Sequence, residues 1–253
     1  MSDATSSARR VYLCGPTEVA TQVRWLLDYR SLQPRELALR DQDRRHWSHR
    51  IHAEGPVPND IRATMDLLKD VVSLPVREAL DIALTLDFYK QPDPDIDPMQ
   101  WANTTAGELV NRAKYRGSVA ARDALVERMV GVVRTHPFYA AAEYVAPVPG
   151  HSAGGYSFGV DLARRVAAAL ALPVAEVTCR SAERLPAKER DVNGGVNLDG
   201  EFALPHEVHG RIVLVVDDVW RSGDSMHALG QAARAKGARA VVGLTGARTM
   251  RGR

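Results

Sequence analysis

The sequence lacks the patterns that mark membrane, secreted or strongly charged proteins. Its 253 residues include two cysteines, Cys14 and Cys179, too few for a disulfide framework or a cysteine metal cage. No apolar run approaches the roughly 20 residues that a membrane helix needs, and the opening MSDATSSARR has no apolar core of a signal peptide. The formal net charge of +2 argues against a strong overall basic field. We therefore expect a cytoplasmic protein with no membrane partner.

What is present is ordinary globular composition, with 45% hydrophobic and 25% charged residues. The length suffices for one large domain or two smaller ones. One seam is visible in KQPDPDIDP, residues 90–98, where prolines alternate with aspartates and disfavour regular structure. It predicts a division into residues 1–95 and residues 96–253.

The region before this seam has mainly helical periodicity. Residues 11–14 predict a short strand, and apolar residues at helical spacing predict helices over 17–32 and 58–74, the latter extended over 76–89. Residues 1–95 are thus predicted to be a mostly helical region of unknown role, and docking of a protein partner is one alternative left open.

The region after the seam alternates strands and helices. Helices are predicted over 105–117, 118–136, 159–172 and 225–237, and strands over 143–149, 173–179, 211–218 and 238–245. The apolar runs of the strands are continuous rather than alternating, which is typical of a parallel sheet buried on both faces. The expected fold class is α/β, with a parallel sheet flanked by helices. The long polar interval 180–210 is predicted to be a hairpin, lid or mobile flap.

The most informative stretch is RIVLVVDDVWRSGDS, residues 211–225. A buried strand leads into Asp217 and Asp218, and ligands of open parallel sheets bind at the carboxyl ends of strands. A turn containing Gly223 then opens a helix, whose free N–H groups and dipole favour an anion. Ser222 and Ser225 add hydroxyl donors. This layout suits a ligand with hydroxyls or Mg²⁺ at one end and a phosphate at the other, such as a ribose 5-phosphate.

At these residues the chain resembles the type I phosphoribosyltransferase family, whose phosphoribosyl-pyrophosphate (PRPP) motif has the same order as VLVVDDVWRSGDS. The layout is most similar to the competence-associated ComF-like subfamily. RAKYRGS (112–118) is similar to a lysine-tyrosine helix of that group, APVPG (146–150) to its first core strand, and ERDVNGGVNLDGEFAL (189–204) to its flap. The similarity covers roughly residues 105–250.

The resemblance implies binding of PRPP and Mg²⁺ and transfer of phosphoribose to an unidentified nitrogen nucleophile, a base or an amine, with release of pyrophosphate. Asp217 and Asp218 would be the catalytic and metal-binding residues, holding the ribose hydroxyls directly or through Mg²⁺. Two loops would bind the phosphate and pyrophosphate groups; their residues are Arg221, Ser222, Gly223, Asp224, Ser225, Pro149, Gly150, His151 and Ser152. A homodimer is left open.

Two residues depart from the family pattern. Arg221 stands where a small hydroxyl residue is usual, and Asp224 brings a negative charge next to the expected phosphate. An alternative is therefore a catalytically silent protein that senses PRPP or a nucleotide, or serves as a partner in DNA uptake or repair. His46, His49 and His52 are open to two interpretations, a metal site or a basic surface. Trp220 either packs against the fold or stacks on a ligand.

Overall fold

The centre of the molecule is a five-stranded sheet of order β4-β5-β10-β9-β6. The computed structural model describes residues 9–150, 155–181 and 198–250. The strands are β4 (Val72–Ser73), β5 (Ile82–Thr85), β6 (Tyr144–Pro147), β9 (Ile212–Trp220) and β10 (Ala240–Arg248). All pair in parallel except β4, which is antiparallel to β5 at the edge. The predicted α/β class is confirmed.

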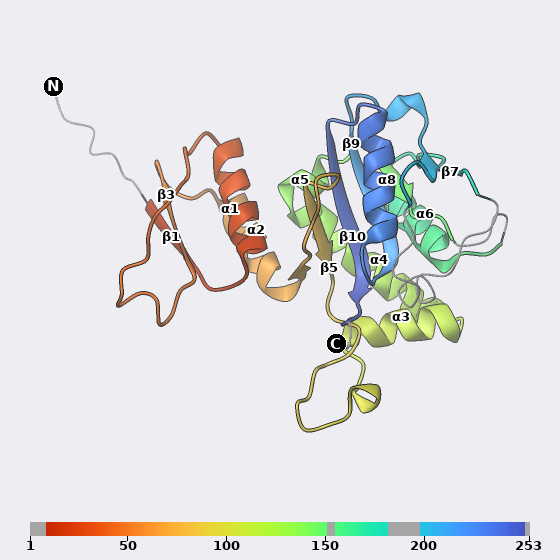
Figure 1. The fold of residues 1–253 in the computed structure, drawn as a ribbon, viewed down its shortest axis with the longest axis horizontal. Helices are drawn as coiled ribbons and strands as arrows, with labels where there is room; N and C mark the ends of the chain where they lie inside the picture. The colour runs from red at the N-terminus through yellow and green to blue at the C-terminus, as the bar shows by residue number, and fades with distance from the viewer. Residues whose placement is uncertain (1–8, 151–154, 182–197, 251–253) are drawn as a thin grey trace.

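Helices cover both faces of this sheet (Figure 1). On one side lie α3 (Thr105–Tyr115), α4 (Val119–Thr135) and α6 (Phe158–Leu170), and on the other lies α8 (Asp224–Ala235). Alternate residues of β9 divide between the two layers: Leu214 belongs to the core that includes α3, α4 and α6, and Val215 to the core that includes α8. Burial on both sides explains why β9 and β10 have continuous apolar runs. A short helix, α5 (Pro137–Ala140), follows α4.

Residues 9–70 form a second, smaller sheet with two helices. The strands β1 (Arg9–Leu13), β3 (His49–Ala53) and β2 (Arg35–Glu36) are antiparallel in the order β1-β3-β2, and α1 (Thr17–Tyr29) and α2 (Asn59–Asp70) accompany them. Figure 1 shows this sheet at one end of the molecule, with α1 and α2 on the side toward the central sheet. The predicted strand and both predicted helices are present.

The expectation of a mostly helical N-terminal region is wrong in three places, the first of which is β4, at residues 72–73 of the predicted helix over 58–74. The strands β2 and β3 carry polar residues on one face, so they give no apolar run. Residues 82–85 were expected to continue a helix, but they form β5, which is buried on both faces between β4 and β10. A short apolar run such as Ile-Ala-Leu-Thr fits either helix or strand, and only the partner strand decides.

The central sheet draws strands from both sides of residue 95, since β5 pairs with β10. The division at residue 95 therefore stays a prediction. The loop at 90–98 is confirmed: it leads into η1 (Pro98–Gln100) and is closed by a bridge between Lys90 and Asn103. No helix within the described ranges is both long and apolar enough to traverse a bilayer.

The predicted strand over 173–179 is largely wrong. Val174 makes an isolated bridge to Val145, and only β7 (Thr178–Cys179) is a strand, paired with β8 (Phe202–Ala203). Pro173 lacks a backbone donor, which limits ladder pairing at the start of the segment. The two-stranded ladder and η2 (His206–Val208) frame the predicted flap, whose residues 182–197 lie outside the described part of the chain.

Candidate functional site

The acid pair lies in the second half of β9, toward the carboxyl end of the parallel sheet. β9 continues past the acids to Trp220, two residues further than the sequence predicted. Asp217 is in register with Thr245 of β10, while β6 ends at Pro147 beside Val216. Because the neighbouring strand β6 stops one residue earlier, the two carboxylates lie at the edge where ligands of such sheets bind.

Asp218 is paired with a lysine that the sequence did not assign to the site. Lys114 Nζ, from the last turn of α3, donates to Asp218 Oδ2 at 2.6 Å, and Asp218 is only 7% exposed. Burial by itself would lower the pKa of Lys114, but the charge and hydrogen bond of Asp218 outweigh it and raise that pKa. Lys114 is therefore a fixed positive charge at the site. The RAKYRGS similarity had indicated this helix but not this contact.

Asp217 is in a different electrostatic state from its neighbour. Its Oδ1 accepts a hydrogen bond from the backbone N–H of Asp218 at 2.8 Å. Burial raises the pKa of Asp217 well above its usual value, and the negative charge of Asp218 raises it further. A carboxyl group in this state is stabilised by a bound cation or by hydroxyl donors, which is what a sugar or Mg²⁺ would supply.

Helix α6 approaches the acids so closely that only glycine fits. A Cβ atom added at Gly159 would lie 2.8 Å from Asp217 Oδ1 and 3.5 Å from Asp218 Oδ1. Gly159 lies in the first turn of α6, which Ser157 caps by accepting from the N–H of Val160. The glycine was not singled out from the sequence, since nothing local distinguishes it from a glycine of ordinary helix packing.

The loop after β9 has the predicted form of a helix-opening turn. Gly223, at the N-cap of α8, has φ +83°, a left-handed conformation that favours glycine. Trp220 is buried, and a Cβ at Gly223 would lie 2.3 Å from its Cζ2 atom. Packing against the loop is therefore the role the structure gives Trp220. Ser222 Oγ accepts from the N–H of Asp224 at 3.5 Å, and Arg221 is exposed.

Asp224 has a cationic partner from an unexpected part of the chain. Arg77, in the segment between β4 and β5, lies with its guanidinium 3.2 Å from Asp224 Oδ1. An acid in the first turn of a helix also interacts favourably with the helix dipole. The extra negative charge that this residue brings to the loop is thus compensated locally. No sequence signal pointed to Arg77, because the contact spans almost 150 residues.

The second predicted loop is only partly within the described residues. Pro149 and Gly150 follow β6 after one intervening residue, and a Cβ at Gly150 would lie 2.9 Å from Cβ of Ser157, so this turn packs against the start of α6. His151 and Ser152 lie outside the described residues. The three histidines that could have formed a metal site do not lie together. In β3, His49 and His52 are on opposite faces, and His46 precedes the strand.

The donor chemistry of the acid pair fits Mg²⁺, which prefers oxygen ligands and is commonly held by one or two carboxylates together with substrate phosphates. Asp217 and Asp218 would hold it, because they place two carboxylates side by side at the end of β9, and a cation there would stabilise the charged form of the buried Asp217. Within the described ranges, no group of three or more His, Cys, Asp or Glu side chains is arranged to hold a metal ion on its own.

No family model matches the sequence, and no curated protein matches it. Among solved structures, the chain is similar to a purine phosphoribosyltransferase from Pyrococcus horikoshii Ot3, with 16% identity, a TM-score of 0.31, and coverage of 47% of this chain and 68% of that one. It is also similar to the adenine phosphoribosyltransferase of Leishmania tarentolae, with 14% identity, a TM-score of 0.39, and coverage of 68% and 79%. Both TM-scores lie below 0.5, so these similarities carry no argument about function.

Proposed function

We propose that this protein is a phosphoribosyltransferase that binds PRPP with Mg²⁺ and transfers phosphoribose to a nitrogen nucleophile with release of pyrophosphate. The observation that carries the proposal is the arrangement along β9 and α8. Two adjacent carboxylates at the carboxyl end of a central parallel strand are followed by a left-handed glycine turn that opens a helix. Hydroxyl acceptors and an anion-binding helix start therefore follow one another within eight residues.

The roles follow from the electrostatics of the two acids. Asp218, charged and held by Lys114, is a fixed acceptor for a ribose hydroxyl. Asp217 has its pKa raised by burial and gains most from a ligand that brings a hydroxyl or a cation. The backbone of Arg221, Gly223 and Asp224 and the hydroxyls of Ser222 and Ser225 bind the 5-phosphate in this proposal. Pro149, Gly150, His151 and Ser152 meet the pyrophosphate.

Catalysis by such a site is mainly positioning and charge stabilisation, because an oxocarbenium-like sugar forms as pyrophosphate departs. Asp217 and Asp218 would hold Mg²⁺, which would supply the positive charge that neutralises the leaving group. The chain itself fixes the ribose through its acid pair and keeps the phosphate at the start of α8. Exclusion of water by the segment 180–210 stays a prediction, as do the ComF-like subfamily, the acceptor and a homodimer.

The decisive experiment is calorimetric titration of PRPP in the presence of Mg²⁺. We expect binding by the native protein and loss of that binding in the double variant Asp217→Asn, Asp218→Asn. The control is Asp66→Asn with Asp95→Asn, which removes the same charge from exposed positions. If the native protein does not bind, or if both double variants bind equally, the proposal is wrong. Sustained pyrophosphate release with a panel of nucleobases and amines then distinguishes an enzyme from a silent PRPP sensor.

A further inference from the structure

The three-stranded sheet has one face that does not contact α1, and the strand register shows which residues share it. Arg10 of β1 and Arg35 of β2 are both paired directly with His52 of the middle strand β3. Directly paired residues point to the same face. Two residues away on that face, Tyr12 is paired with Arg50. These five residues define what we call the outer face, on which two arginines flank a histidine across all three strands and an aromatic ring lies beside them.

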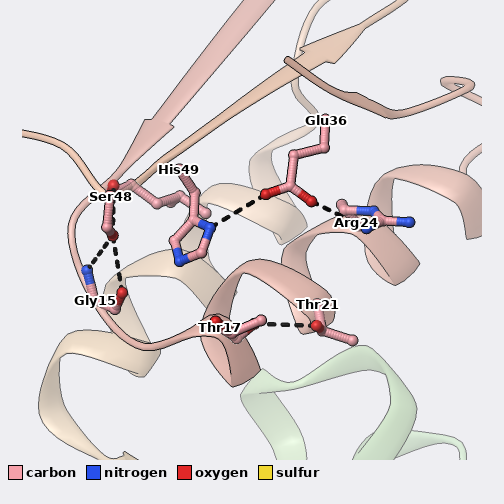
Figure 2. A network of polar contacts seen from close by, with 8 residues as sticks. Gly15, Thr17, Thr21, Arg24, Glu36, Ser48 and His49 are labelled. Carbon is pink, nitrogen blue, oxygen red and sulfur yellow. Dashed lines mark hydrogen bonds and ion pairs between the residues drawn. The ribbon is translucent and has the colours of Figure 1, made fainter. Parts of the chain in front are cut away.

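The opposite, inner face is tied to α1, which fixes the orientation of the sheet. Val11 and Ile51 are paired on this face and are buried. Figure 2 shows Glu36 of β2 between Arg24 of α1 and the ring of His49, each at 3.3 Å. Because the apolar core and this network hold one side, the outer face is directed away from α1.

A second aromatic ring extends the outer face. Trp47, just before β3, lies with its ring centroid 5.8 Å from that of Tyr12 and is 41% exposed. Arg50 lies over the other ring, with Cζ 5.9 Å from the centroid of Tyr12, and donates to the carbonyl of Ala38 at 3.2 Å. The aromatic pair is thus held in place by a buried arginine, while the side chain of Trp47 stays partly exposed.

The charge of this surface is positive although that of the chain is nearly balanced. The outer face, its neighbour Glu54 and the adjoining loop 38–47 contain six arginines and three acids; the arginines are Arg10, Arg35, Arg40, Arg44, Arg45 and Arg50. Two of the acids are paired within the surface, Glu54 with Arg35 at 3.6 Å and Asp41 with Arg44 at 3.6 Å. Arg10, Arg40 and Arg45 are exposed.

We propose that the outer face binds single-stranded nucleic acid. Exposed arginines attract the phosphates, and an accessible aromatic ring offers a platform on which an unpaired base stacks; the two features together are characteristic of single-strand binding surfaces. Duplex grooves offer no free base to such a ring. Binding is local to this sheet and independent of the acid pair on β9. With a chain net charge of only +2, the attraction comes from this surface and is sensitive to salt.

The test is fluorescence anisotropy with labelled oligonucleotides of about 12 nucleotides, within the usual range of single-strand site sizes. DNA, RNA and duplex DNA are compared at low salt. We expect the native protein to bind single strands more tightly than duplex. The variant Arg10→Glu, Arg35→Glu should bind at least about tenfold more weakly. The control Arg164→Glu, Arg239→Glu makes the same charge change at arginines whose side chains are 59% and 65% exposed, and it should bind as the native protein does.

A second readout isolates stacking from charge. Binding should quench tryptophan emission in the native protein, and this quenching should be lost in Trp47→Phe while affinity stays within about threefold, because phenylalanine still stacks. Trp47→Ala should weaken binding about tenfold. Absence of single-strand binding, tighter binding of duplex, or equal binding by the two double-arginine variants would overturn the proposal. Binding that disappears in the Asp217→Asn, Asp218→Asn variant would also overturn it, since that result places the oligonucleotide at the acid pair.

Discussion

The two sheets of this protein differ in what covers their faces. The central sheet is packed by helices on both sides, so its chemistry is confined to the ends of strands, where Asp217 and Asp218 lie. The three-stranded sheet packs one face against α1 and leaves the other to cations and aromatic rings. A sheet buried twice can offer a ligand only its edge, whereas a sheet buried once can offer a whole face. The two proposed sites follow this difference.

The largest effect is expected at the turn that opens α8. Gly223→Ala adds a Cβ at φ +83° and 2.3 Å from the ring of Trp220, so it should lower the free energy of unfolding by more than the roughly 1–3 kcal/mol that a strained backbone alone costs. Gly200→Ala is the matched control, with φ +70° and no atom within 4 Å of the added Cβ. Urea unfolding measures both. Equal destabilisation would show that the Trp220 contact does not restrict this turn.

The second-largest effect is expected at His136, which is fully buried beside Phe138 and Tyr139. Burial lowers the pKa of His136 from 6.5 to about 4. Stability from this group is present above pH 6.5 and is lost as the pH falls toward 4, by about 3 kcal/mol at most. His136→Leu should flatten this acid-dependent loss in thermal unfolding followed against pH. The exposed His206→Leu should leave it intact; if both variants keep the native pH profile, His136 is not the sensitive group.

A third prediction compares charge pairs from the two regions. Lys114→Met removes the partner of the buried Asp218 and should cost about 1–3 kcal/mol, less than a fully buried pair because the lysine side chain is 34% exposed. Glu36→Gln removes the shared partner of Arg24 and His49 in the smaller sheet, where the glutamate side chain is 48% exposed. It should cost at most about 1 kcal/mol. If chemical denaturation shows a larger loss of stability for Glu36→Gln than for Lys114→Met, the predicted difference between the two charge pairs is wrong.

The smallest expected effect is a gain in stability rather than a loss. Because the pKa of Asp217 is raised in the folded state, this carboxyl group destabilises the fold increasingly as the pH rises above the ordinary value of 3.8, and the full cost is present above the raised pKa. Asp217→Asn should therefore raise the melting temperature near neutral pH while weakening PRPP binding. The gain should shrink as the pH approaches 3.8. A variant that is less stable than the native protein at neutral pH would show that the carboxylate is satisfied without a ligand.

The sequence predicted the central sheet better than the smaller one for a physical reason. A strand such as β9, covered on both faces, must be apolar at successive positions. Such a continuous apolar run can be recognised from the local sequence alone. The strand β3, His49–Ala53, has arginine and histidine on its outer face, and the buried Arg50 stands next to the buried Ile51, so its composition resembles a loop. β5 was predicted to be helix because its four residues, all of them buried, have no period of their own.

What the sequence by itself determined is the motif: an apolar strand, two acids, a glycine turn and a helix, all within one continuous stretch. Local chemistry was enough there because each step depends on neighbouring residues. Only the tertiary structure decided the partners of that motif. Lys114 reaches Asp218 from α3, Arg77 compensates Asp224 from before β5, and Gly159 lets α6 close on the acids. These contacts join residues far apart in the chain, so no local sequence pattern predicts them.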